Sequence, residues 1–169
     1  VNAYYHVDRF FALVESLGFG ISTYFDGTTF PIRVDHRGCS PNTDPAYNTC
    51  PNGISINAHC GGNGSGGTGH CCYMLAHLTD TTNPISIACD WRVHLHELAG
   101  HGILNDHVNS GRFGFSHSAG DSIAVILCDP ESQITGDDRF LNFPWVRNPI
   151  GRRCDRAVID GWAWGGRND

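Results

Sequence analysis

A stretch of nine residues, HLHELAGHG at positions 94–102, carries the side chains best suited to metal chemistry. It places His96 and Glu97 next to each other, with His101 four residues after the glutamate. Hydrolysis at a zinc ion needs protein ligands that are held rigidly, an open position for water, and a general base beside that water. Two imidazoles and a carboxylate within one turn or so of helix offer two of the ligands and the base.

The spacing is one residue longer than the H-E-x-x-H pattern, in which two histidines on one helix bind a single zinc ion. On a regular α-helix, residues four apart differ in direction by about 40°, but residues five apart differ by about 140° and cannot share a metal. A π-bulge brings positions i and i+5 back into line, and Gly100 tolerates the altered backbone. We therefore expect a π-type distortion near Ala99 and Gly100, with His96 and His101 as zinc ligands and Glu97 as general base.

The third metal ligand has to come from further along the chain. Asp121 follows His101 by twenty residues, at the start of a second helical pattern, and is our first candidate. His117 lies four residues before Asp121 on the same element and is the alternative third ligand. His107 ranks below both, because the metzincin pattern that uses its offset also needs a glycine where Leu104 stands.

Other metal geometries remain open at this point. On an undistorted helix, His94, Glu97 and His101 share one face, which would make Glu97 a ligand and exclude His96. A separate structural zinc site could be built from His59, Cys60, His70 and Cys71. Disulfide bonds explain cysteines better than zinc does in an oxidising compartment. A calcium ion could bind acidic residues near the tail, although surface turns explain them as well: Asp129, Glu131, Asp137 and Asp138.

Three segments carry a family resemblance: NAHCGGNGSGGTGH (57–70), HELAGHG (96–102) and HSAGDSIAVIL (117–127). In this order they resemble the catalytic core of gluzincin zinc metallopeptidases of the thermolysin and fungalysin type, over roughly residues 54–128. The segment AYYHVDRFFALVESLGF (3–19) is similar to the helix that opens those catalytic domains. The extended H-E-x-x-G-H form resembles the zinc motif of dipeptidyl peptidase III, whose helix accommodates the additional residue.

The resemblance implies a role for each matching position. His96 and His101 would bind zinc, and Glu97 would be the base. Asp121 stands where the family has a glutamate ligand, a shorter arm similar to the aspartate ligand of aspzincins. The strand that pairs with the backbone of the substrate is matched by Asn57 and Ala58.

The chain departs from the family pattern at three places. Val125 stands where the family has an aspartate that orients a ligand, and Arg112 stands where it has a tyrosine. No histidine follows His117, so the second catalytic histidine of the family has no counterpart. Either the chain is cut short at its C-terminus, or arginines such as Arg112, Arg152 and Arg153 bind the substrate and stabilise the transition state.

Composition narrows the class of protein. The chain has 169 residues, of which 40% are hydrophobic and 17% charged, as in a globular domain. The net charge is −6, and the basic residues are scattered, which argues against a nucleic-acid partner. No apolar run is long enough to span a membrane. Eight cysteines predict four disulfide bonds and a secreted, extracellular or periplasmic location.

Sequence periodicity predicts the elements that position these residues. Apolar spacing predicts a helix over 2–17 that ends at Gly18, and a helical pattern over 85–108 that contains the active-site helix. A second helix is predicted over 118–129, with Ser118 as a possible N-cap. Residues 19–60 contain three β-prone pieces, ISTYF, FPIRV and ISINA, and residues 61–70 form a glycine loop.

We therefore expect an α+β, zincin-like and disulfide-rich fold, as a single domain over 1–169. A β-containing N-terminal lobe covers about 1–84, and a helical part covers about 85–169. The expected function is that of a secreted zinc-dependent endopeptidase, acting on a peptide or protein through a metal-activated water with Glu97 as base. The alternative is a non-catalytic, disulfide-stapled structural or binding module, derived from a metallopeptidase and retaining a structural metal.

Overall fold

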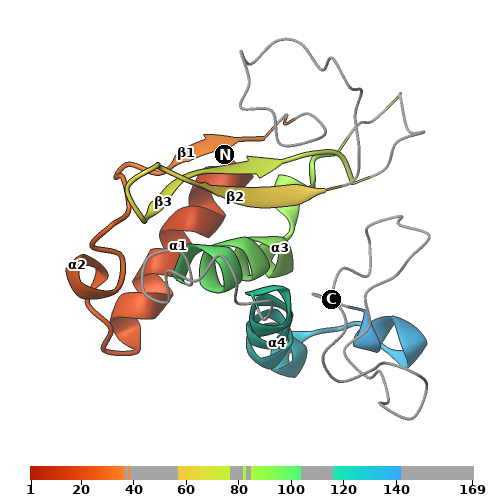
Figure 1. The fold of residues 1–169 in the computed structure, drawn as a ribbon. Coiled ribbons are helices and arrows are strands. Elements are labelled where there is room, and N and C mark those ends of the chain that lie inside the picture. The colour runs from red at the N-terminus through yellow and green to blue at the C-terminus, as the bar shows by residue number, and fades with distance from the viewer. Residues whose placement is uncertain (37, 39–56, 77–81, 83–84, 104–115, 142–169) are drawn as a thin grey trace, which may run out of the picture.

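A computed structural model describes residues 1–36, 38, 57–76, 82, 85–103 and 116–141. A small sheet forms one layer, helices α1 and α3 cover one of its faces, and α4 packs beyond α3 (Figure 1). The fold is therefore α+β, as predicted. In chain order the elements are α1 (Asn2–Ser16), α2 (Ile21–Tyr24), β1 (Arg33–Asp35), β2 (Ala58–Gly62), β3 (Thr68–Tyr73), η1 (Ile87–Cys89), α3 (Trp91–Leu95), η2 (His96–Gly102), α4 (Ser116–Cys128), η4 (Asp129–Glu131) and η5 (Gly136–Phe140).

Helix α1 follows the predicted amphipathic pattern. Phe10 and Val14, four residues apart, are its buried side chains, and they join the hydrophobic core. The helix ends at Ser16 with Leu17 as its C-cap, and Gly18 takes the left-handed conformation with φ of +86°, which glycine adopts without strain. The prediction for residues 2–17 is confirmed to within one residue.

The β-prone segment ISTYF was predicted wrongly. Residues Ile21–Tyr24 form a single helical turn, α2, and not a strand. The N–H groups of Thr23 and Tyr24 bond to the carbonyl of Gly20, and the Phe25 side chain that follows is almost fully buried. Local β-propensity was overridden because burial of Phe25 against α1 fixes the path of the chain.

The sheet has the strand order β1-β3-β2, with β1 parallel and β2 antiparallel to β3. Residues 61–62 and 68–70, predicted as part of a loop, belong to strands β2 and β3. Only the turn of this hairpin, residues 63–67, lacks strand structure. The predicted segment FPIRV (30–34) overlaps β1 at Arg33 and Val34. The predicted segment ISINA (54–58) overlaps β2 at Ala58, and its residues 54–56 lie outside the described residues.

The Asn63 side chain fixes the hairpin turn to the segment after α2. Its amide nitrogen donates to the carbonyl of Gly27 at 2.7 Å and to the Thr29 hydroxyl at 3.0 Å. Its amide oxygen accepts from the N–H groups of Ser65 and Gly67. Both ends of the carboxamide are therefore used in holding the turn.

Alternation along the strands divides the sheet into two faces. The face toward the helices carries core residues, namely Val34, Ala58, Cys60, Cys71 and Tyr73. The register pairs His59 with Cys72 and Gly61 with His70, so these residues point to the opposite face. The core continues into the helices through residues that include Val93, Leu95 and Leu98.

Capping side chains set where the helix that carries the histidine motif begins. The Asp90 carboxylate accepts a hydrogen bond from the N–H of Arg92 at 2.8 Å, as an N-cap of α3. The Ser86 hydroxyl caps η1 in the same way. Helix α4 begins at Ser116, two residues before the predicted cap Ser118. Among the residues that the structure describes, no helix is long and apolar enough to cross a membrane.

Candidate metal centre

The helix that carries the histidine motif changes from α to π at His96. Helix α3 ends at Leu95, and η2 is a π-helix from His96 to Gly102. The Ile103 N–H donates to the carbonyl of Leu98, five residues earlier, which is the π pattern. The predicted distortion is thus confirmed, and it extends over the whole span from His96 to His101.

Three histidines converge where η2 meets α4. One side-chain nitrogen from each of His96, His101 and His117 lies within 4.8 Å of the other two. The Nδ1 atom of His117 is 3.3 Å from the Nε2 atom of His96. Two nitrogen ligands at about 2.0–2.1 Å from a tetrahedral zinc ion are themselves about 3.3–3.4 Å apart, so this separation fits a shared metal ion.

Asp121 takes a different place from the one predicted. It is not in the group of three convergent nitrogens, and its Oδ1 atom lies 2.7 Å from the Nδ1 atom of His96. A carboxylate there accepts a hydrogen bond from Nδ1–H, so the lone pair of the neutral ring is on Nε2, the atom that faces His117. The nitrogen that groups with His96 and His101 belongs to His117, the alternative third ligand.

The geometry of α4 explains why both residues reach η2. His117 and Asp121 are four residues apart, so they project from one face of the helix. Gly120 lies on the same face, directly against His96. A Cβ atom at position 120 would come within 2.5 Å of the His96 carbonyl oxygen and 3.0 Å of His96 Nδ1. Glycine at this position permits the close approach of α4. The sequence analysis did not predict a role for Gly120. The signal that could have indicated one is a glycine inside a helical pattern.

Glu97 is buried beside the three histidines. Its side chain is 4% exposed, and its Oε1 atom lies 4.0 Å from the Nε2 atom of His96. The carboxylate is therefore close to the convergent nitrogens without being one of the grouped atoms. The role of Glu97 as general base stays a prediction.

The geometry based on His94, Glu97 and His101 is contradicted. It requires an undistorted α-helix, whereas residues 96–102 are π-helical. Both ring nitrogens of His94 are also used elsewhere. Nδ1 lies 2.8 Å from the Tyr73 hydroxyl, and Nε2 lies 2.9 Å from the carbonyl oxygen of Ala88.

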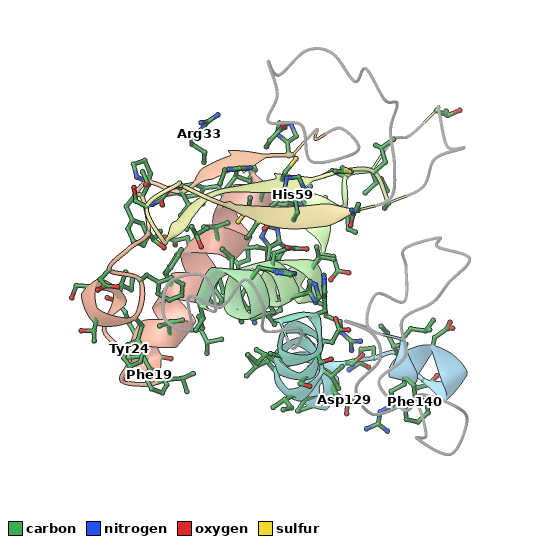
Figure 2. All side chains as sticks on the ribbon, viewed as in Figure 1. Phe19, Tyr24, Arg33, His59, Asp129 and Phe140 are labelled. Atoms are coloured by element: carbon green, nitrogen blue, oxygen red, sulfur yellow. The ribbon has the colours of Figure 1, made fainter. Side chains whose placement is uncertain are left out.

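The structural zinc site of two histidines and two cysteines is also contradicted. Figure 2 shows His59 on strand β2, and the register places it across from Cys72. His59 and His70 point to one face of the sheet, whereas Cys60 and Cys71 point to the other, toward the helices. The four side chains cannot surround one ion.

The predicted disulfide bonds and the predicted calcium site involve cysteines and acidic residues outside the histidine group. Among the described residues, no cysteine pair lies at disulfide-bond distance, although Cys60 and Cys71 face each other with their Sγ atoms 2.6 Å apart. Asp129, the first residue of η4 directly after α4 (Figure 2), accepts two hydrogen bonds from Arg139. Among the described side chains, Asp129 and Asp138 belong to no group that could hold a metal ion, and those of Glu131 and Asp137 lie outside the described part.

The other predicted site residues lie partly outside the described part of the chain. Asn57 and Ala58 are at the start of β2, with the Asn57 side chain accepting from the Ala58 N–H at 2.9 Å. His107, Arg112, Arg152 and Arg153 lie outside the described residues.

Comparison with known proteins gave no match: no family model, no curated protein and no solved structure is significantly similar to the chain.

Proposed function

We propose that the protein is a zinc-dependent endopeptidase whose metal is held by His96, His101 and His117. The observation that carries the proposal is the convergence of these three nitrogens beside a buried glutamate. Imidazole suits zinc, and three protein ligands leave the fourth tetrahedral position open for water, as catalytic sites require. Zinc, when bound, supplies a Lewis acid that polarises a carbonyl and makes a bound water more acidic.

In this proposal Asp121 orients a ligand and does not bind the metal. Ligating histidines commonly donate their second ring N–H to a carboxylate, which fixes the tautomer and makes the ligand more basic. The Asp121–His96 contact of 2.7 Å has this form. In the gluzincin pattern, an aspartate that orients a ligand stands where this chain has Val125. Asp121, one turn earlier, would orient His96 in its place.

Glu97 is the proposed general base. It would accept a proton from the attacking water and pass it to the leaving amine. Its place, 4.0 Å from His96 Nε2 and nearly out of contact with solvent, favours this role over that of a surface residue.

The peptide substrate would pair with the edge strand β2. The Met74 N–H bonds to the carbonyl of Asn57 directly opposite, so the backbone of the next residue, Ala58, turns toward the outer edge of the sheet. Strand β2 also contacts η2. An extended peptide added at this edge would therefore lie beside the metal site, and it would take over the Ala58 N–H from the Asn57 side chain, which accepts from it at 2.9 Å.

The finer description of the fold belongs to the same proposal. A zincin-like arrangement is supported by the order of edge strand, metal helix and following helix with a further ligand. The disulfide-rich character and a secreted or periplasmic location rest on the eight cysteines. Among these, Cys60 and Cys71 are directly opposed on neighbouring strands and suit a cross-strand disulfide.

The test combines metal analysis with proteolysis. Purified wild-type protein should bind one zinc ion per chain and cleave an unstructured protein such as casein, and Glu97→Gln should keep the zinc and lose cleavage. Glu15→Gln, at an exposed glutamate on α1, is the matched control and should leave both unchanged. Zinc binding without cleavage by the wild type would favour the non-catalytic module with a structural metal. Absence of zinc would refute the site itself.

A further inference from the structure

A buried hydrogen bond links the sheet to the metal-binding helix two residues before His96. The Tyr73 hydroxyl and the Nδ1 atom of His94 are 2.8 Å apart, and neither residue has any exposed surface. Nε2 of His94 donates its proton to the carbonyl of Ala88 at 2.9 Å, because a carbonyl can only accept. Nδ1 then carries the lone pair and accepts from Tyr73. Burial lowers the pKa of His94 to about 4, in keeping with a neutral ring.

Tyr73 connects this bond to the strand beside the site. It is the last residue of β3, and its cross-strand partner on β2 is Ala58. Its ring also packs on that of His94, with centroids 4.3 Å apart. The Tyr73–His94 contact therefore fixes the distance between the end of the central strand β3 and the last turn of α3, where the α-helix gives way to the π-helix.

The other end of β3 meets the other end of η2. Thr68, the first residue of β3, is fully buried, and its hydroxyl lies 3.5 Å from the carbonyl oxygen of Gly102, the last residue of η2. The two ends of β3 thus contact the helix on both sides of its π segment: at His94, two residues before η2 begins, and at Gly102, its last residue. This matters because π-helices are rare and an α-helical register would turn His96 and His101 about 140° apart.

We propose that Tyr73 is a positioning residue of the metal site: through His94 it holds the α-to-π transition in register, so that His96 and His101 converge. The inference rests on the proposed metal site for its functional meaning. Its structural core, that the hydroxyl of Tyr73 stabilises η2, does not depend on a bound metal. The two can therefore be tested separately.

The variant Tyr73→Phe removes the hydroxyl and keeps the ring. In the metal-free protein, amide hydrogen exchange over residues 97–103 should become about two- to tenfold faster than in the wild type, which matches the net contribution of one hydrogen bond. Exchange in α1 should change less. Equal acceleration of α1 and η2, or no acceleration of either, would overturn the proposal.

A zinc competition assay gives the second readout. The zinc dissociation constant should rise about two- to tenfold in Tyr73→Phe. Asn63→Ala is the matched control, since it removes hydrogen bonds from the hairpin turn and should leave zinc affinity unchanged. If wild-type protein binds no zinc, the proposed function fails, while the exchange experiment still decides the role of Tyr73. Should Tyr73→Phe not fold, Thr68→Val tests the opposite end of η2 with the same two measurements, and an unchanged η2 would contradict the proposal.

Discussion

Replacement of Asp121 by asparagine distinguishes a carboxylate that orients a ligand from one that binds the metal. Asp121 Oδ1 lies 2.7 Å from His96 Nδ1, in a contact whose side chains are 13% and 3% exposed, respectively. Hydrogen bonds to a charged group contribute about 1.5–3 kcal/mol, which corresponds to roughly 10- to 100-fold in affinity. Asp121→Asn should therefore raise the zinc dissociation constant by about this factor and leave the stoichiometry unchanged.

Removal of a true ligand should have a larger effect. Structural zinc sites with four ligands bind with about 10–16 kcal/mol in total, or about 2.5–4 kcal/mol for each ligand, so His117→Ala should lower affinity by roughly a hundred- to a thousandfold. Competition with a chromophoric chelator measures both variants, and Asp138→Asn, at an exposed aspartate, is the control that should match wild type. If Asp121→Asn abolishes binding while His117→Ala is nearly neutral, the assignment of the two residues is reversed and our reasoning is wrong.

Three further predictions follow from the described contacts. Gly120→Ala should destabilise the protein by about 1–3 kcal/mol and weaken zinc binding, because the methyl group would collide with His96; a melting curve and zinc affinity equal to those of wild type would count against the close approach of α4. In metal-free protein, the lowered pKa of His94, about 4 against 6.5 when unfolded, means that stability is complete above pH 6.5 and declines by about 3 kcal/mol as the pH falls to 4. Urea titrations across this range should show the decline, and His94→Gln should flatten it; an equal slope in both proteins would exclude His94 as its cause. Protein oxidised by a disulfide such as oxidised glutathione, then alkylated and digested without reduction, should yield the peptides of Cys60 and Cys71 joined with the loss of two hydrogens; recovery of both as alkylated thiols would refute the cross-strand pair.

The π-helix was predictable from the five-residue spacing of His96 and His101. Two histidines five residues apart can share a metal only if the helix is distorted between them, and residues 96–102 are indeed π-helical. The helix of residues 2–16 was predictable for a similar reason, since its apolar residues recur at helical spacing over four turns.

The choice between Asp121 and His117 was not determined by spacing. Both lie on one face of α4, one turn apart, and which side chain groups with His96 and His101 depends on how closely the helix approaches η2. Gly120 sets that approach by allowing contact with the backbone of His96. The His117 imidazole, one turn earlier on α4, then reaches Nε2 of His96. The shorter Asp121 carboxylate contacts Nδ1 of His96.

Two other features depend on tertiary contacts that a local pattern does not contain. Residues 21–24 have the β-branched and aromatic composition of a strand, but the burial of Phe25 selects a helical turn. His94 looks like a metal ligand in sequence, and only the fold brings Tyr73 and the Ala88 carbonyl to its two nitrogens.

The most direct test of the metal site is a crystal structure of the zinc-loaded protein, with the ion located by anomalous scattering at the zinc edge. We predict one ion at about 2.0–2.1 Å from a nitrogen of each of His96, His101 and His117. Asp121 should remain on Nδ1 of His96, and a water should fill the fourth position within reach of Glu97. An ion bound by Asp121 in place of His117, or an ion with four protein ligands and no water, would contradict this account.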